Sequence, residues 1–482
     1  MCSNLGLMAS SQTCIRLWWQ RKEFHMQGNQ MKTRAFTNHK FRRLQSTAET
    51  HDIDCSGKIL NILRERGLID ACTNDGLLSE ASRKPLRVYC GFDPTADSLH
   101  LGNLLGIVVL SWFQRFGHTP VILIGGATGS IGDPSGKSVE RPLLEIETIQ
   151  SNTAKIVQNL EEILSRNSKH SPPLVMNNLD WFEDMSFLDF LREVGRYARV
   201  GTMIARDSVK SRLDSEAGMS FTEFSYQLLQ GYDFMHLFRN HGVTVQIGGS
   251  DQWGNIVAGS DLVRRIIAKE SVFGLTFPLL LKSDGKKFGK SEEGAIWLSP
   301  ERLSAFKFYQ YLLQTKDEDV LRLMMMLTFI PLDEIKIYEK LMDSTDYVPN
   351  TAQIRLAEEV TKFVHGEVGL QQAVAATNGL LPGTDTELDI DVLQSLVNVV
   401  PTAIFKRNEI IGVPLVDIIV KVGLRQSKGE VRRLINGGGV RLNNDKVLDD
   451  STCINPINLI AGKMLLISTG KKNKFLLQVE SS

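Results

Sequence analysis

The chain has 482 residues, of which 42% are hydrophobic and 23% charged, and 55 basic residues balance 55 acidic ones to a formal net charge of zero. This length and composition indicate a globular protein of two or three domains with a sizeable core. The neutral charge gives no sign of a nucleic-acid partner for the chain as a whole. The longest apolar run, 104–113, is too short to span a membrane, so no membrane partner is expected.

Residues 1–46 differ from the rest because they carry eight basic side chains and a single acidic one, Glu23. This imbalance, with scattered Ser and Thr, predicts an organellar transit peptide over 1–47 and therefore a location in the mitochondrial matrix or the chloroplast stroma. The alternative is a disordered basic arm that contacts RNA. The six cysteines lack metal-ligand spacing, which predicts no structural zinc site and a reducing compartment.

Residues 48–295 alternate between strand and helix patterns. Three stretches read as strands that end in glycine or polar residues: 86–92 (LRVYCGF), 119–129 (TPVILIGGATG) and 243–255 (VTVQIGGSDQWGN). The first is followed by a helix expected to begin near Ser98, with Ser98 or Asp97 as its N-cap. The alternation predicts an α/β fold with a Rossmann-like, doubly wound parallel sheet, whose strand ends converge on one ligand-binding crevice.

The remainder of the chain changes pattern twice. Residues 296–400 are mainly helical in pattern and predict a helical domain with a linker, in which 380–390 (LLPGTDTELDI) is a candidate hinge. Residues 408–482 predict two short helices followed by two pairs of strands, which would form a separate small α+β domain.

The stretch 89–103 (YCGFDPTADSLHLGN) places polar residues at the start of a helix. A helix N-terminus presents unpaired N–H groups that suit phosphate. His100 and Thr95 would add donors to phosphate oxygens, and Gly102 would let a flat group such as adenine approach the backbone. The alternative is that His100 caps its own helix and Gly102 only packs.

A lysine-bearing stretch, 286–291 (KKFGKS), follows the strand pattern FPLLL. Its Lys287 and Lys290 could close over a polyphosphate and neutralise the charge that grows as pyrophosphate leaves. A lysine-rich loop alone is more often solvated surface. The helix start at His100, about 190 residues earlier, makes the combination specific.

These motifs resemble the two signatures of class I aminoacyl-tRNA synthetases, here His100-Leu101-Gly102-Asn103 and Lys287-Phe288-Gly289-Lys290-Ser291. Within that class the chain is most similar to bacterial-type tyrosyl-tRNA synthetases of organelles, from about residue 55 to the C-terminus. The blocks GGATGSIGDPSGK, FTEFSYQLLQGYD and QIGGSDQWGN extend the likeness. Many relatives have a second histidine in place of Asn103. Since an Asn N–H can donate a similar bond, the ribose contact is expected to survive without a proton-transfer role.

Tyr226, Gln230 and Asp233 recur at i, i+4 and i+7 within 224–233 (FSYQLLQGYD). On a helix they would lie within about 60° of one another and form a polar stripe on an otherwise apolar surface. A solvent-facing stripe would normally contain Lys and Glu. The pattern therefore favours the lining of a pocket.

The resemblance implies a role for each candidate site residue. The substrate phenol would be bound by Tyr89 and Asp233, its ammonium group by Tyr226, Gln230 and Asp133, and its carboxylate by Gln252. ATP would be bound by Cys90, Asp93, Gly102, Asn103, Asp251 and Ser291, with Cys90 and Asp251 at the ribose. The catalytic residues would be Thr95, His100, Lys287 and Lys290.

The stretch 132–138 (GDPSGKS) looks like a phosphate-binding P-loop, but it has three residues rather than four between its glycines and so is not one. Lys137 and Arg141 are interpreted as basic residues near the pyrophosphate or the acceptor end of tRNA. For Arg141 the alternative is a surface salt bridge.

The C-terminal domain resembles the S4-type RNA-binding domain of such synthetases, and the helical domain would lie on the anticodon side. Basic residues cluster around its second short helix and the next strand: Arg425, Lys428, Arg432, Arg433 and Arg441. Such a patch would bind RNA phosphates with strong salt dependence. The alternative is an ordinary charged helix face.

The implied enzyme joins tyrosine to tRNA(Tyr) with ATP as substrate and Mg²⁺ on the ATP phosphates, as a homodimer. Two other functions stay open. A tryptophan-specific enzyme of similar fold is disfavoured by Tyr89 and Asp233, because an indole has no phenolic oxygen. A catalytically silent RNA-binding protein is disfavoured by the His, Gly and Lys residues retained in both signatures.

Overall fold

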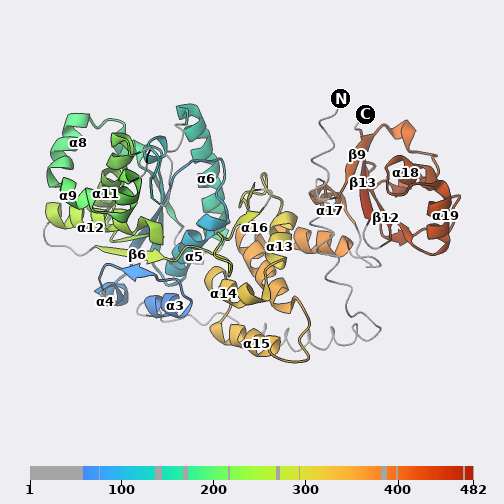
Figure 1. Ribbon diagram of the computed structural model, residues 1–482, viewed down its shortest axis with the longest axis horizontal. Helices are drawn as coiled ribbons and strands as arrows, with labels where there is room; N and C mark the ends of the chain where they lie inside the picture. The colour runs from blue at the N-terminus through green and yellow to red at the C-terminus, as the bar shows by residue number, and fades with distance from the viewer. Residues whose placement is uncertain are drawn as a thin grey trace. The chain divides into compact units, whose positions relative to one another are not determined.

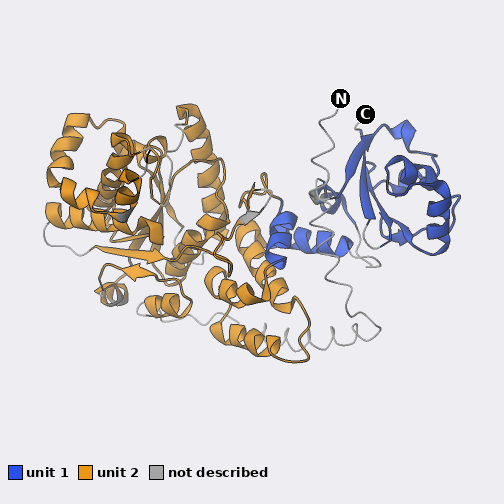
Figure 2. Cartoon of the chain, viewed as in Figure 1, with its two compact units in different colours: residues 1–52, 304–314, 367–482 blue, residues 53–303, 315–366 orange. Residues whose placement is uncertain are grey.

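The computed structural model describes residues 58–74, 76–135, 144–166, 172–214, 216, 218–267, 272–291, 294–380, 388–397, 400–470 and 473–480. The predicted transit peptide, Lys137 and Arg141 lie outside this part. The chain divides into two compact units, coloured separately in Figure 2. The N-terminal unit comprises 53–303 and 315–366, and the C-terminal unit contains 304–314 and 367–482. Among the described residues, no helix has both the length and the apolar character of a membrane span.

A six-stranded sheet forms the centre of the N-terminal unit, with the strand order β1-β6-β5-β2-β3-β4. Its strands are β1 (Ala71–Cys72), β2 (Arg87–Phe92), β3 (Thr119–Ile124), β4 (Leu174–Asn177), β5 (Val245–Gly249) and β6 (Phe273–Phe277). All neighbouring pairs from β6 to β4 are parallel, and β1 joins the edge antiparallel. The predicted doubly wound parallel sheet is thereby confirmed. The two-residue β1 is too short to show a pattern in the sequence.

Helices cover both faces of this sheet (Figure 1). On one face α5 (Leu101–Arg115) packs against β2 and β3, and Gly106 allows close contact with the Cys90 thiol. On the other face α11 (Phe221–His241) and α12 (Trp253–Ile267) build a core with β2 and β3 that includes Tyr89 and Phe234. The long helix α6 (Ile146–Arg166) lies beside α5.

Shorter elements complete the N-terminal unit. They are α3 (Ile59–Glu65), α4 (Gly76–Arg83), α7 (Leu179–Phe182), α8 (Phe187–Glu193), α9 (Val200–Ile204), α10 (Asp207–Leu213), α14 (Asp317–Leu327), α15 (Leu332–Met342), and the two-stranded pair β7 (Lys290–Ser291) and β8 (Gly294–Ala295). Short 3₁₀ turns are η1 (Thr128–Ser130), η2 (Gly195–Tyr197) and η3 (Ser250–Gln252).

The expectation that the first long helix begins near Ser98 is wrong. Helix α5 begins at Leu101, and the extended residue His100 is its N-cap. The two residues expected to cap it are engaged elsewhere. The Ser98 hydroxyl donates to the Leu99 carbonyl and accepts from the Ser299 backbone N–H. Asp97 forms ion pairs with Lys155 and Arg302.

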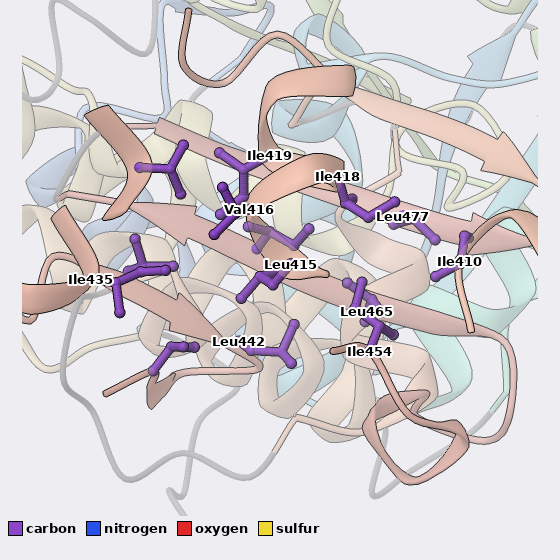
Figure 3. Packing of buried hydrophobic residues seen from close by; sticks show 14 of the residues in the cluster. Ile410, Leu415, Val416, Ile418, Ile419, Ile435, Leu442, Ile454, Leu465 and Leu477 are labelled. Carbon is purple, nitrogen blue, oxygen red and sulfur yellow. The ribbon is translucent and has the colours of Figure 1, made fainter. Parts of the chain in front are cut away.

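The C-terminal unit has a five-stranded sheet in the order β11-β10-β12-β13-β9. Its strands are β9 (Thr402–Phe405), β10 (Val440–Leu442), β11 (Asp445–Lys446), β12 (Met464–Thr469) and β13 (Asn473–Val479); its helices are α13 (Ala305–Leu313), α17 (Ile390–Ser395), α18 (Leu415–Lys421) and α19 (Lys428–Asn436), with the 3₁₀ turns η4 (Arg407–Glu409) and η5 (Pro456–Asn458). Figure 3 shows the core between α18, α19 and the sheet, in which Leu415, Ile435 and Leu477 pack together. The predicted α+β module is confirmed, while its likeness to S4 domains stays a prediction.

One helix, α16 (Thr351–Gly379), contributes to both units. Its backbone leaves the helical conformation at Gly366, where φ is 74° and ψ is −178°. Only glycine adopts this region readily, so the break is encoded in the sequence. The predicted domain boundaries at 295 and 400 stay predictions.

Candidate active site

The ends of three neighbouring parallel strands bring most of the candidate residues to one edge of the sheet. Strand β2 lies between β5 and β3, so the segments that follow these strands emerge side by side. Ligands bind at this edge in doubly wound folds, where the order of the strands reverses. Here the reversal falls between β5 and β2.

A buried phenol, Tyr89 of β2, and a buried carboxylate, Asp233 of α11, lie at this edge. Asp233 is 2% exposed; its Oδ1 accepts from Trp181 Nε1 at 2.9 Å and its Oδ2 from Asn178 Nδ2 at 3.1 Å. Burial raises the pKa of Asp233 to about 7 despite these two hydrogen bonds. Burial, and then the charge of Asp233, also raise the pKa of Tyr89 well above its ordinary value. The Tyr89 hydroxyl is buried and has no hydrogen-bond partner within the described part of the chain.

A second carboxylate, Asp93, is bound by two hydroxyl groups. Its Oδ2 accepts from the Tyr226 hydroxyl at 2.8 Å, and its Oδ1 accepts from Thr128 Oγ1 at 2.8 Å. Asn178 Nδ2 donates both to Thr128 Oγ1 at 3.0 Å and to Asp233, so one amide links the two carboxylates. This places Asp93 beside helix α11, although the resemblance implied a role for it at ATP.

The segments that follow β5 and β3 add an amide and another carboxylate. Gln252 Nε2, from η3 after β5, donates to Asp133 Oδ2 at 2.7 Å. Asp133 Oδ1 accepts from the Ser135 backbone N–H at 3.0 Å. On α11, the Gln230 Oε1 atom is buried without a hydrogen-bond partner among the described residues. Tyr226 and Asp233 are also buried, so these two side chains do not face solvent, while the expected lining of a pocket stays a prediction.

Two residues at the start of α5, His100 and Asn103, cap this helix. His100 Nδ1 accepts from the Gly102 backbone N–H at 3.1 Å, and Asn103 Oδ1 accepts from the His100 backbone N–H at 3.1 Å. This reciprocal arrangement is the local alternative raised for His100, and it fixes the ring at the first turn of the helix. Gly102 is exposed at the same point.

The lysine hairpin, residues 280–291, lies directly against this helix start. Gly289 has φ of 95°, and a Cβ there would lie 3.0 Å from Leu101 Cβ and 3.3 Å from the Gly102 nitrogen. The Ile296 N–H donates to the Gly289 carbonyl at 2.9 Å, and the Leu101 N–H donates to the Ile296 carbonyl at 2.7 Å. The two signature segments, about 190 residues apart in sequence, are therefore in contact. The side chains of Lys290 and Ser291 lie outside the described part, and Lys287 is exposed.

The other candidates near the sheet differ in exposure. Thr95 and Asp251 are exposed, and the Thr95 N–H donates to the Asp93 carbonyl at 2.8 Å. Cys90 is buried, and burial raises the pKa of its thiol to about 12, so the sulfur is uncharged. Three residues that shape the site were missed by the sequence analysis: Thr128, Asn178 and Trp181. They come from segments after β3 and β4 that carry no recognisable spacing pattern.

The candidate RNA-binding residues lie in the C-terminal unit, and most have partners. Lys428 pairs with Asp417 at 2.8 Å, Arg432 with Asp450 at 3.6 Å and Arg425 with Glu430 at 3.6 Å. Arg441 donates to the Asn444 carbonyl at 2.7 Å. Of these five cationic side chains, only that of Arg433 has neither an ion pair nor a hydrogen bond with a described residue, and Arg433 is exposed. The pairing means that the patch presents less free charge than the sequence suggests.

Comparison with known proteins places this geometry in a family. Residues 81–382 match the family model "tRNA synthetases class I (W and Y)", and residues 391–477 match "Tyrosine--tRNA ligase SYY-like C-terminal domain". The chain is 54% identical over 421 residues to a tyrosine–tRNA ligase of Protochlamydia amoebophila, which covers 87% of this chain and 99% of the relative. It is 55% identical over 426 residues to the chloroplastic/mitochondrial tyrosine–tRNA ligase of Arabidopsis thaliana, covering 87% and 83%.

A solved structure gives the same result. The C-terminally truncated mitochondrial tyrosyl-tRNA synthetase of Aspergillus nidulans is 33% identical, with a TM-score of 0.58, over 65% of this chain and 92% of that one. The matches extend across both the sheet-bearing unit and the C-terminal module. The chain therefore belongs to the class I tRNA synthetases and, within them, to the tyrosine–tRNA ligases.

Proposed function

We propose that this chain activates tyrosine with ATP and transfers the tyrosyl group to the terminal adenosine of tRNA(Tyr) in organelle translation. The observation that carries the proposal is the buried pair of Asp233 and Tyr89 at the sheet edge where ligands bind. An unpaired phenolic hydroxyl beside a carboxylate suits the hydroxyl group of a substrate phenol, which can donate to Asp233 and accept from Tyr89.

The pocket would discriminate by hydrogen bonding. A buried polar group left without a partner costs about 1–3 kcal/mol, and more when it is charged. Phenylalanine would leave the Tyr89 hydroxyl without a partner and would offer no donor to Asp233, which would keep only its bonds from Trp181 and Asn178. The substrate ammonium group would lie near the carbonyl oxygen of Gln230 and the carboxylates of Asp93 and Asp133, whose partners Tyr226 and Gln252 keep them oriented.

ATP would lie across the start of α5, where exposed Gly102 leaves room beside the backbone. The tyrosine carboxylate attacks the α-phosphorus, the bond to the bridging oxygen breaks, and pyrophosphate leaves. This step needs no side-chain nucleophile, so the protein contributes position and positive charge. The charge would come from Lys287 and Lys290, and from Mg²⁺ that enters with the ATP phosphates as part of the substrate. A ribose hydroxyl of tRNA then displaces AMP from the tyrosyl carbonyl.

The C-terminal unit would bind tRNA through Arg433 and its basic neighbours, since exposed guanidinium groups bind phosphate. For the location, the proposal rests on the basic segment 1–46 and on the organellar Arabidopsis relative.

A second copy of the chain would cover an apolar surface of the N-terminal unit. Helices α8 and α9 expose Phe187, Leu188, Val200 and Ile204, and Leu188 is 67% exposed. Large apolar side chains gathered on neighbouring helices are a mark of an interaction site, and a twofold dimer buries the same patch on both partners.

Tyrosine-dependent exchange of pyrophosphate into ATP by the full chain tests the activity. Exchange is expected with tyrosine, and at most trace exchange with phenylalanine or tryptophan. Tryptophan-dependent exchange would support the related specificity instead. A folded chain that binds RNA but exchanges nothing with any of the three would contradict the proposal.

A further inference from the structure

The lysine hairpin contacts the first two turns of α14, a helix that contains none of the predicted site residues. The hairpin closes through Leu281, which pairs with Lys287 in an isolated bridge, and through a bond from the Lys282 N–H to the Lys286 carbonyl at 2.7 Å. Its turn begins at Ser283. Residues 281–283, which we call the stem, contact α14 at two residues, Leu281 and Ser283.

Two acids of α14 contact Ser283: Glu318, whose Oε2 accepts from the Ser283 hydroxyl at 3.1 Å, and Asp319, which bonds to both its backbone and its hydroxyl. The Asp319 side chain is 3% exposed; its Oδ1 accepts from the Ser283 backbone N–H at 3.0 Å, and its Oδ2 accepts from the Ser283 hydroxyl at 3.2 Å. Arg322, one turn later, pairs with Asp319 Oδ1 at 2.9 Å and also donates to the Leu281 carbonyl. Burial alone would raise the pKa of Asp319, but the hydrogen bonds from Arg322 and Ser283 outweigh it and lower the pKa. The Asp319 carboxylate is therefore charged at neutral pH.

An acidic residue in the first turn of a helix ordinarily serves its own helix by favourable interaction with the dipole. Asp317 occupies the same turn and can supply that interaction. Asp319 is buried and its hydrogen bonds go to the hairpin and to Arg322, so helix stability alone does not account for it. A charged group buried at 3% exposure needs such partners, because desolvation without them is costly.

The hairpin is thus fixed at two places. Asp319 and Arg322 hold its stem, and Gly289 packs on the start of α5 at its other end. The exposed Lys286 and Lys287 lie between these two anchors. Fixing both ends limits how far the lysines can move from the helix start at which ATP phosphates would bind.

We propose that Asp319, oriented by Arg322, is a positioning residue for the activation step, which it serves by holding the stem of the lysine hairpin. This inference rests on the proposed function. A positioning residue acts through the lysines, so its loss should change the ATP step and leave the tyrosine pocket intact.

The test compares Asp319→Asn with the wild-type full chain. In Asp319→Asn the kcat of tyrosine-dependent pyrophosphate exchange should fall at least 10-fold, or the KM for ATP should rise to the same extent. The dissociation constant for tyrosine should stay within 2-fold. Ser283→Ala, which keeps the backbone N–H bond, should lose only about 2- to 3-fold. The matched control is Asp333→Asn on α15, an acid that is 94% exposed beside Lys336 and should behave as wild type.

Limited trypsin digestion gives a second readout that does not depend on activity. The hairpin carries Lys282, Lys286 and Lys287, so release of its stem should speed native-state cleavage there several-fold in Asp319→Asn, as located by mass spectrometry. Wild-type rates of both exchange and hairpin cleavage would overturn the inference. So would an equal loss of tyrosine affinity with cleavage throughout the chain, which would mean a general folding role. If wild type itself shows no exchange, the proposed function fails, while the digestion still decides whether Asp319 holds the hairpin.

Discussion

Replacing Asp233 by asparagine should change how the stability of the N-terminal unit depends on pH. In the folded protein burial raises the pKa of Asp233 to about 7, whereas in the unfolded chain it should be near 3.9. Between these values the folded state holds a proton that the unfolded state has released. Stability is therefore lost as pH rises through this window, and the full penalty is present above pH 7.

The size of the effect follows from the shift. A change of one pKa unit corresponds to 1.36 kcal/mol, so a shift of roughly three units amounts to about 4 kcal/mol over the whole window. Between pH 5 and pH 8 the wild type should lose about 3 kcal/mol that Asp233→Asn does not lose. The asparagine amide will also oppose one of the two donors, Asn178 Nδ2 or Trp181 Nε1. That cost is independent of pH and cancels in the comparison.

The assay is urea unfolding of both proteins at several pH values, following the transition that added tyrosine shifts in the wild type, because ligand binding identifies the unit that contains the site. Differences between the two proteins remove the contribution of every other titrating group. A difference in unfolding free energy that stays constant within about 0.5 kcal/mol from pH 5 to pH 8 would show that Asp233 titrates normally, and the reasoning would fail.

Two further outcomes are expected. Tyr89→Phe removes a hydroxyl that has no hydrogen-bond partner among the described residues, so thermal unfolding should be unchanged or slightly higher, while equilibrium dialysis should show tyrosine binding weakened about 5-fold, equivalent to about 1 kcal/mol. Equal loss of stability and affinity would contradict this. Leu188→Glu should convert a dimer into monomers by analytical ultracentrifugation, whereas Val348→Glu, at another exposed apolar residue of the same unit, should not; a Leu188→Glu protein that stays dimeric would place the interface elsewhere.

Much of the fold could be predicted because the strands of a buried parallel sheet are continuous apolar runs with glycines at their ends. The segments 119–129 and 243–255 show this pattern, and their apolar parts form β3 and β5 of the central sheet. The start of α5 was misplaced because Ser98 and Asp97 are good N-cap residues by type. Their side chains are occupied by Ser299, Lys155 and Arg302, which are far away in sequence.

The candidate site could be predicted where one helix or one motif carries several of its residues. Tyr226, Gln230 and Asp233 share a helix, so their spacing was enough to suggest a pocket. Asn178 and Trp181 could not be found in this way. They follow β4, more than 50 residues before Asp233, and only the packing of the sheet brings their donors to its carboxylate. Asp319 could not be found from the sequence either, because its partner Ser283 lies far from it along the chain.

The buried polar groups of the candidate site lower the stability of the fold that holds them. Asp233 would be more stable ionised in water, and the Tyr89 hydroxyl and Gln230 Oε1 are buried without hydrogen-bond partners among the described residues. Strand β2 and helix α11 hold these atoms in place because Tyr89 packs against Phe234, with ring centroids 5.4 Å apart. A ligand that forms hydrogen bonds with these groups recovers the free energy that their burial costs, and a ligand that cannot form them does not recover it. Asp233→Asn should therefore gain stability relative to wild type as the pH rises and lose selectivity for tyrosine at the same time, because both effects come from one buried carboxylate.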